Sequence, residues 1–386
     1  MKKIAIITLN GYTNYGNRLQ NYATQEVFSS LGFFVETILV DHTPKNSKIN
    51  KTKGIKKIIA MASKVRRSGL NLKAFKKILL LTSTYLNKVK NKSNQEKRIK
   101  TFKDFSLYYI KETNYILSES NIPENLDDKY DYFIAGSDQI WNPFYTNGSP
   151  IYFLTFASQN KRVAYSASFG LSGIPPIYIE NYRLWLSEMH RISVREEDGA
   201  SIVKELTGKD VIVTLDPTIM ITKNKWLAIG KKSKHKPSCN YLLTYFIGDI
   251  NQNAKLKIKD IAKNNNLKII NLNNPRNSKT YIIGPSEFID YINSASLVCT
   301  DSYHGTIFSI LLERPFIVFE RTVKNFSMYS RIETLLDKFD LNNRKDVNIK
   351  NNNRVFDVDF ESVRPIIDIE REKALNYLRE ALSINE

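Results

Sequence analysis

Along most of this chain, short apolar runs typical of β-strands alternate with stretches whose apolar residues have helical spacing. Short apolar runs at residues 3–9, 33–40 and 132–135 are typical of buried β-strands. Residues 18–32 carry apolar side chains at helical spacing and end at a glycine, so they predict an amphipathic helix. A strand, a loop, a helix and a second strand in this order indicate the opening of a Rossmann-like α/β domain.

The same alternation continues through the first half and begins again in the second half. Further strands of the first half are expected within 161–170, 191–195 and 210–218. The second half is expected to contain strands at 240–248, 267–273, 296–301 and 316–320, with helices at 252–266, 285–295 and 304–314. A chain of 386 residues is too long for one ordinary core, which also favours two domains.

We therefore predict an α/β protein with two Rossmann-like domains and a cleft between them. The first domain would span residues 1–218 and the second residues 219–355. Residues 356–386 would form a long amphipathic helix that packs back on the first domain. Ligands in such sheets bind at the carboxyl ends of the strands, where the polar loops considered below are expected to lie.

Residues 45–103 interrupt the alternation and hold the excess positive charge of the chain, whose net charge is +18. This segment contains 19 of the 57 basic residues and one of the 39 acidic residues, which leaves 38 of each elsewhere. Two amphipathic stretches, 54–67 and 71–86, predict a basic helical insertion in the first domain. Such a segment attracts polyanions or an anionic membrane surface, and a solvated helical face also accounts for it. Its few aromatic residues argue against nucleic acid as a partner, because single-stranded nucleic acid is bound by stacking on aromatic rings.

The composition indicates a globular protein of a reducing compartment. The chain has two cysteines, and no stretch approaches the roughly 20 apolar residues of a membrane-spanning helix, so we expect a cytoplasmic protein. No phosphate-binding loop or dinucleotide fingerprint occurs. The four histidines do not have metal-ligand spacing, so we expect no metal site; they are His42, His190, His235 and His304.

His304 lies in the stretch CTDSYHGT, between a predicted strand and a predicted helix. A helix N-terminus offers unpaired N–H groups and a partial positive charge, which together bind anions. The neighbouring residues add three hydroxyl groups and a glycine that would let a ligand approach the backbone, namely Ser302, Tyr303, Thr306 and Gly305. The stretch fits an anion site with a proton donor, and it fits equally well a capped helix with a structural histidine.

Two other loops follow predicted strands. Arg195 has the side chain best suited to bidentate binding of carboxylate or phosphate, although a surface ion pair with Glu196 or Glu197 also accounts for it. In the stretch AGSDQIWNP, Asp138 could act as a general base and Trp141 could stack on a sugar. A turn in which Asp138 bonds backbone amides while Trp141 fills the core is the alternative.

Seven stretches of the chain together resemble the polysaccharide pyruvyl transferase family. They are YGNRLQNYATQEVFSSLG, FIAGSDQIWNP, YSASFG, ISVREEDGA, LDPT, TDSYHGTIFSILLERPFIVF and SRIETLL. The resemblance runs from Lys2 to about Leu336 apart from the basic insertion. It implies a fold similar to GT-B glycosyltransferases, with phosphoenolpyruvate as donor, no cofactor, and two sugar hydroxyls as acceptor. The product would be a pyruvate ketal on a surface polysaccharide or its lipid-linked precursor.

Because ketal formation requires a general acid and a general base, we expect His304 to act as acid or phosphate partner and Asp138 as base. The donor would be bound by Arg195, Ser302, Tyr303, His304, Gly305, Thr306 and Arg331. The acceptor would be bound by Asn17, Arg18, Gln20, Ser137, Gln139 and Trp141. Some family members have an arginine two residues before the histidine, where this chain has Ser302. Arg195 or Arg331 would then have to supply that positive charge.

Two other functions fit parts of the same pattern. A glycosyltransferase with a nucleotide-sugar donor would use the same architecture and the same helix N-terminus. A basic polyanion-binding module would use residues 45–103 alone. Within the preferred function, this segment is expected to attach the protein to the inner face of an anionic membrane, where a lipid-linked acceptor would be found. The sequence leaves the oligomeric state and the acceptor sugar open.

Overall fold

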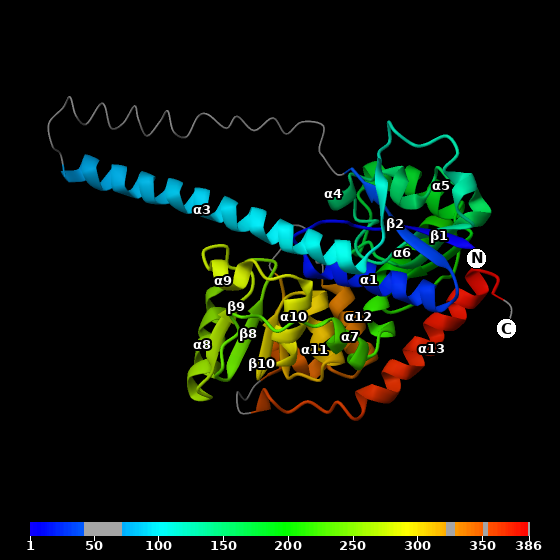
Figure 1. The fold of residues 1–386 in the computed structure, drawn as a ribbon. Coiled ribbons are helices and arrows are strands. Elements are labelled where there is room, and N and C mark those ends of the chain that lie inside the picture. The colour runs from blue at the N-terminus through cyan, green and yellow to red at the C-terminus, as the bar shows by residue number, and fades with distance from the viewer. Residues whose placement is uncertain (42–71, 322–328, 350–353, 385–386) are drawn as a thin grey trace.

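The computed structural model describes residues 1–41, 72–321, 329–349 and 354–384, and for residues 72–90 it describes only the backbone. In this part of the chain two parallel β-sheets, each flanked by helices, form two lobes (Figure 1). The sheet of the first lobe contains β1 (Lys3–Ile7), β2 (Phe34–Val40), β3 (Glu112–Leu117), β4 (Tyr132–Ala135), β5 (Arg162–Ala167), β6 (Arg191–Val194) and β7 (Ile212–Val213). The sheet of the second lobe contains β8 (Tyr241–Tyr245), β9 (Lys268–Asn271), β10 (Leu297–Thr300) and β11 (Phe316–Val318).

The helices mostly alternate with these strands along the chain. Those of the first lobe are α1 (Tyr15–Ser30), α3 (Leu72–Tyr109), α4 (Pro143–Thr146), α5 (Ile179–Ser187) and α6 (Glu197–Thr207). The later helices are α7 (Lys223–Ile229), α8 (Gln252–Asn264), α9 (Ser278–Tyr281), α10 (Pro285–Asn293), α11 (Tyr303–Leu311), α12 (Ser330–Lys338) and α13 (Val363–Ala381). No helix among the described residues is both long enough and apolar enough to cross a membrane.

In each sheet there is one point at which successive strands stop being added on one side and are added on the other. The first sheet has the order β3-β2-β1-β4-β5-β6-β7, and the second has the order β11-β10-β8-β9. The reversal therefore lies between β1 and β4 in the first lobe and between β8 and β10 in the second. Loops that leave the carboxyl ends of strands at such a point diverge to opposite faces of the sheet and leave a crevice for ligands.

All ten strands predicted from apolar runs are present, since parallel strands buried on both faces consist of nearly continuous apolar residues. The structure adds one strand, β3, which the sequence did not indicate. Its residues, ETNYIL, mix polar and apolar side chains because β3 is an edge strand that is only partly buried. An edge strand of this kind lacks the apolar run that marks the central strands.

The basic segment is joined more closely to the first sheet than the sequence pattern predicted for an insertion. The sequence pattern places its end near residue 103, whereas α3 continues to Tyr109 and leads into β3, which pairs with β2. The segment is thus part of the crossover between two neighbouring parallel strands. The amphipathic stretch at 54–67 lies outside the described residues. The N-terminal part of α3 projects away from both lobes (Figure 1).

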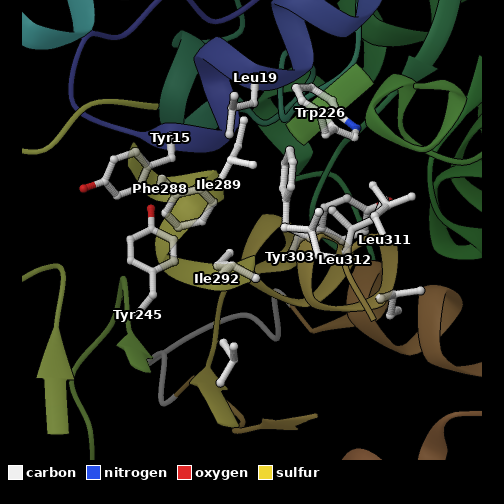
Figure 2. Close-up of a cluster of buried hydrophobic side chains, with 14 of the residues drawn as sticks. Tyr15, Leu19, Trp226, Tyr245, Phe288, Ile289, Ile292, Tyr303, Leu311 and Leu312 are labelled. Carbon is white, nitrogen blue, oxygen red and sulfur yellow. The ribbon is translucent and has the colours of Figure 1, made fainter. Parts of the chain in front are cut away.

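Helix α1 forms the main contact between the lobes. Thirteen of its 16 residues are buried, because the first sheet covers one face and the second lobe covers the other. Tyr15 stacks on Phe288 of α10 with 4.3 Å between the ring centroids. Figure 2 shows Tyr15 and Leu19 of α1 in one apolar cluster with Phe288 and Ile289, with Trp226 of α7 in the same cluster. The two lobes thus share one apolar core.

Helix α3 strengthens this contact through one buried arginine. The Nε atom of Arg98 donates to the carbonyl of Thr13 in the first lobe at 3.0 Å. Its Nη1 atom donates to the carbonyl of Tyr281 in the second lobe at 2.6 Å. The guanidinium also lies 4.4 Å from the centre of the Tyr15 ring. Arg98 therefore ties the loop between β1 and α1 to the second lobe.

The C-terminal helix α13 returns to the first lobe. Tyr377 and Leu378 lie in an apolar cluster with Ile4 and Ile6 of β1. The hydroxyl of Tyr377 donates to the carbonyl of Ala164 in β5 at 2.6 Å. The last turns of α13 therefore cover one face of the first sheet.

This packing predicts a position-dependent loss of stability along α13. Replacement of the fully buried Leu378 by alanine (Leu378→Ala) should lower the free energy of unfolding of the first lobe by about 2–5 kcal/mol, because a cavity remains against β1. The matched variant Ile369→Ala, at a side chain that is 65% exposed, should change it by about 0.5 kcal/mol or less. Urea denaturation followed by tryptophan fluorescence measures both. Equal effects at the two positions would contradict this packing.

Candidate active site

A pocket of about 430 Å³ lies where the two sheet reversals face each other. Its walls in the first lobe come from the loop after β1, the start of α1 and the loop after β4. Its walls in the second lobe come from the residue positions that follow β8, β10 and β11, together with α12. The pocket thus collects the carboxyl ends of strands from both sheets, which is where open α/β sheets bind ligands.

The start of α11 forms one wall of the pocket. Ser302 is the N-cap, and its Oγ atom accepts a hydrogen bond from the backbone N–H of Gly305 at 3.3 Å. The carboxylate of Asp301 accepts hydrogen bonds from the amides of Ile247 and Gly248 at 2.7 and 2.8 Å. These bonds fix the junction between β10 and α11. The positive end of the helix dipole is thereby directed at the pocket.

His304, in the first turn of α11, is 6% exposed and lines the pocket. Its Nε2 atom is buried without a hydrogen bond and lies 3.5 Å from a carboxylate oxygen of Asp216. The rest of the ring lies against Gly16 in the first turn of α1, where a Cβ atom would overlap with Nδ1. Only glycine at this position allows the imidazole of the second lobe to approach the first lobe so closely.

Asp216, which the sequence did not single out as a site residue, connects the charged groups behind this wall. Its Oδ2 atom accepts hydrogen bonds from Ser137 Oγ at 2.6 Å and from Arg195 Nη1 at 2.8 Å. Its Oδ1 atom accepts two more from the amide and hydroxyl of Thr218. Burial alone would raise the pKa of Asp216. The positive charges of His304 and Arg195 and these hydrogen bonds instead hold its pKa well below the usual range.

Arg195 occupies a different position from the one that its predicted role requires. Its side chain is completely buried, pairs with Asp216, and lies 4.6 Å from the centre of the Tyr303 ring. Burial alone would lower the pKa of Arg195, but the carboxylates of Asp216 and Asp138 raise it above its usual value. Arg195 does not line the pocket. Arg195 instead supports the pocket indirectly, through its ion pair with Asp216 and its contact with the ring of Tyr303.

Asp138 lies on the opposite wall, in the first lobe. Its φ angle of 91° is rare for a residue other than glycine. One carboxylate oxygen accepts a hydrogen bond from Asn17 Nδ2 at 2.7 Å, and the other accepts one from the amide of Gln139 at 2.8 Å. Strained backbone of this kind is often found at functional sites. Asp138 is thus held against the pocket by a side chain of α1 and by its own loop.

Two arginines line the pocket. Arg331 of α12 is almost fully buried, and its pKa falls to about 10 because of burial and because of the positive charge of Arg195 nearby. Arg321 follows β11, and its side chain is 15% exposed. The sequence did not single out Arg321. The pocket therefore has a cationic side in the second lobe and the carboxylate of Asp138 in the first.

The pocket brings together seven of the residues predicted from sequence. These are Asn17, Asp138, Gln139, Ser302, Tyr303, His304 and Arg331. Ser137 and Arg195 lie behind them, where both bond Asp216. The roles of all these residues toward a ligand stay predictions.

The structure does not support the predicted contacts of five other residues. Trp141 is fully buried and stacks on Phe153 in the first core, so its ring does not face a sugar. Arg18 and Gln20 are completely buried on α1 and bond Glu112 and Thr8, respectively. The remaining two serve the packing of α11, because a Cβ atom on Gly305 would overlap with Thr300 Oγ1 and the hydroxyl of Thr306 donates to the carbonyl of Ser302.

Gly16, Asp216 and Arg321 contribute to the site but were not assigned a role from sequence. Asp216 was visible only as part of the stretch LDPT after a predicted strand. Its importance depends on His304 and Arg195, which are distant in sequence. Among the described residues, no group of three or more His, Cys, Asp and Glu side chains could hold a metal ion.

A family model described as polysaccharide pyruvyl transferase matches residues 14–322. The chain belongs to the polysaccharide pyruvyl transferase family. Membership supports a transferase that modifies a polysaccharide by pyruvylation, with the polysaccharide as acceptor. No curated protein matches the chain.

Solved structures are similar to this family member in fold. One is a protein described as a UDP-N-acetylglucosamine 2-epimerase from Listeria monocytogenes, with a TM-score of 0.51, 12% identity, and coverage of 100% of this chain and 97% of that chain. Another is UDP-GlcNAc 2-epimerase from Neisseria meningitidis bound to UDP-GlcNAc, with a TM-score of 0.47, 12% identity and full coverage of both chains. The predicted fold class, an α/β protein with two Rossmann-like domains similar to the GT-B fold, is confirmed.

The ion pairs of Asp216 predict a pH-dependent contribution to stability. Because its pKa is lowered on folding, the stabilisation is present above the unfolded value of about 3.9 and is lost as the pH falls through the lower folded value. Asp216→Asn should therefore lower the free energy of unfolding by about 3–5 kcal/mol at neutral pH. The difference from the wild type should shrink as the pH falls below about 4.

Urea denaturation at a series of pH values measures this contribution. Asp368→Asn is the matched control, because the side chain of Asp368 is 74% exposed in an ion pair on the surface of α13. A loss of stability that is the same at every pH would show that Asp216 acts without its charge.

Proposed function

We propose that this family member transfers the enolpyruvyl group of phosphoenolpyruvate to two hydroxyls of a surface polysaccharide or its lipid-linked precursor. The products would be a pyruvate ketal and phosphate. The observation that carries this proposal is the pocket itself, in which His304, at the start of a helix, and two arginines of one lobe face the carboxylate of Asp138 in the other.

The cationic side of the pocket suits the donor. Phosphoenolpyruvate carries a phosphate and a carboxylate, which both require positive charges or N–H donors. The start of α11 offers amides and the positive end of a helix dipole, and a phosphate is stabilised by both. Arg331 supplies a guanidinium to the same pocket, and desolvation strengthens its attraction for an anion. We therefore assign the phosphate to this wall.

The reaction requires a proton donor and a proton acceptor. The methylene carbon of the donor takes up a proton and becomes a methyl group, while one acceptor hydroxyl forms a bond to the adjacent carbon. The bond from that carbon to the phosphate oxygen then breaks, and the second hydroxyl closes the ketal. Of the two hydroxyl protons that are lost, one is balanced by the new methyl group and the other by the released phosphate.

His304 is the proton donor in this proposal. Its Nε2 atom lies 3.5 Å from the carboxylate of Asp216, its Nδ1 atom lies against Gly16, and the side chain lines the pocket. Asp138 is the proton acceptor for the attacking hydroxyl. Its hydrogen bond from Asn17 fixes one carboxylate oxygen, so the geometry of the base is set before the acceptor binds.

Incubation with phosphoenolpyruvate and a panel of glycans tests the function. We expect acceptor-dependent release of phosphate and a pyruvylated product detected by mass spectrometry. Thermal stabilisation by a nucleotide-sugar, with none by phosphoenolpyruvate and no product across the panel, would instead identify a glycosyltransferase.

Variants test the assigned roles in the same assay. His304→Asn and Asp138→Asn should each lower the rate about 10²–10⁴-fold, while the exposed His190→Asn should leave it unchanged. Gly16→Ala should also lower the rate, because its methyl group displaces the imidazole. Gly173→Ala is its control, since a Cβ atom there meets no other atom within 4 Å. Equal rates in His304→Asn and the wild type would exclude His304 as the acid.

We also propose that the protein acts in the cytoplasm, at the inner face of the membrane, through its basic segment. Replacing the lysines and arginines of residues 45–90 by glutamine should abolish sedimentation with vesicles that contain phosphatidylserine. Each such charge contributes about 1 kcal/mol near an anionic surface. Vesicles of phosphatidylcholine alone are the control. Undiminished binding of the neutralised variant to anionic vesicles would contradict membrane attachment through this segment.

A further inference from the structure

Arg321 is a cation of the pocket for which the reaction outlined above has no role. It follows β11 and lies across Gly248, where a Cβ atom would be 2.6 Å from Arg321 Cγ. The aliphatic part of the side chain thus packs on the loop after β8. The guanidinium beyond it forms part of the pocket wall.

Asp301 holds one edge of this guanidinium. Arg321 Nε donates to Asp301 Oδ2 at 3.1 Å, and Nη2 donates to the Asp301 backbone carbonyl at 3.3 Å. Asp301 is itself fixed, because its carboxylate accepts hydrogen bonds from the amides of Ile247 and Gly248. The guanidinium is therefore oriented before any ligand arrives, which lowers the entropic cost of binding.

The other edge of the guanidinium has no hydrogen-bond partner among the residues that the structure describes. A guanidinium has a side edge formed by Nε and one terminal nitrogen, and an end edge formed by both terminal nitrogens. In Arg321, Asp301 occupies the side edge, while Nη1 forms no hydrogen bond with any residue that the structure describes. The free end edge presents two parallel N–H groups, and this geometry matches the two oxygens of a carboxylate.

The second cation of the pocket belongs to a different part of the wall. Arg331 comes from α12 and lies 6.0 Å from the ring of Tyr303, at the start of α11. Arg321 comes from the chain after β11 and is held at the end of β10. Two separately supported cations suit a ligand with two anionic groups better than they suit a single phosphate.

We propose that Arg321 binds the carboxylate of the donor, and that it thereby distinguishes phosphoenolpyruvate from ligands that carry phosphate alone. This inference rests on the proposed function, because it assigns one contact of the donor. In this arrangement the phosphate lies with Arg331 and the start of α11, and Arg321 fixes the opposite end of the molecule. Arg321 is then the specificity determinant of the donor site.

Calorimetric titrations of the full chain with phosphoenolpyruvate and with inorganic phosphate, both without acceptor, test the proposal. Arg321→Gln should weaken the binding of phosphoenolpyruvate about 10- to 100-fold, which is the effect of losing hydrogen bonds to a charged group. The affinity for phosphate should change by less than about 2-fold, which also shows that the rest of the pocket remains folded. The affinity of Arg321→Lys for phosphoenolpyruvate should lie between those of Arg321→Gln and the wild type, because lysine keeps the charge but loses the paired N–H groups.

Two further variants make the test specific. Gly248→Ala keeps all charges but pushes Arg321 aside, so it should cause the same selective loss as Arg321→Gln. Arg276→Gln removes one exposed arginine of the same lobe and should bind both ligands as the wild type does.

The outcomes separate this inference from the proposed function. If Arg321→Gln binds phosphoenolpyruvate as tightly as the wild type, the inference is overturned while the proposed donor stands. An equal loss of affinity for both ligands would overturn the assignment of Arg321 to the carboxylate. If the wild type binds phosphoenolpyruvate no more tightly than phosphate, the proposed donor fails, and this inference fails with it.

Discussion

The apolar contact of α1 with the second lobe is the interaction on which the rest of the structure depends. Tyr15 stacks on Phe288 in a core that both lobes share, so the angle between the lobes is set by packing rather than by a linker. The residues that follow Tyr15 in α1 are Gly16 and Asn17. The same packing therefore brings Gly16 against His304 and lets Asn17 bond Asp138. Without this contact the two walls of the pocket would not face each other.

Charge balance around the pocket follows from that arrangement. Asp216 is a buried carboxylate with two cationic neighbours, and its hydrogen bonds to Ser137 and Thr218 satisfy its remaining oxygen lone pairs. The positive charge of Arg195 is balanced by Asp216, and its guanidinium lies against the ring of Tyr303. The pKa of Arg331 falls to about 10 because of its burial and because of repulsion from the nearby Arg195. A bound anion would relieve that repulsion, so the cationic wall is arranged for a negatively charged ligand.

The sequence was sufficient for the order of most strands and helices, because buried parallel strands and amphipathic helices have distinct apolar periods. It also singled out His304 and Asp138, which lie in the loops or helix starts that come four and three residues after buried strands. It was insufficient for Trp141, since the same loop fits a sugar contact or a core position, and the choice depends on Phe153. Asp216 and Arg321 were missed because their roles arise from tertiary contacts. Edge strand β3 was missed because an exposed edge needs no apolar run.

The central claim is that the donor binds between the lobes, against the start of α11. A crystal structure with phosphoenolpyruvate tests it most directly. We expect the phosphate beside Arg331 and the first turn of α11, within reach of His304, and the carboxylate beside Arg321. A ligand bound instead in the larger pocket of about 950 Å³ between β7 and α13, with the interlobe pocket empty, would contradict it.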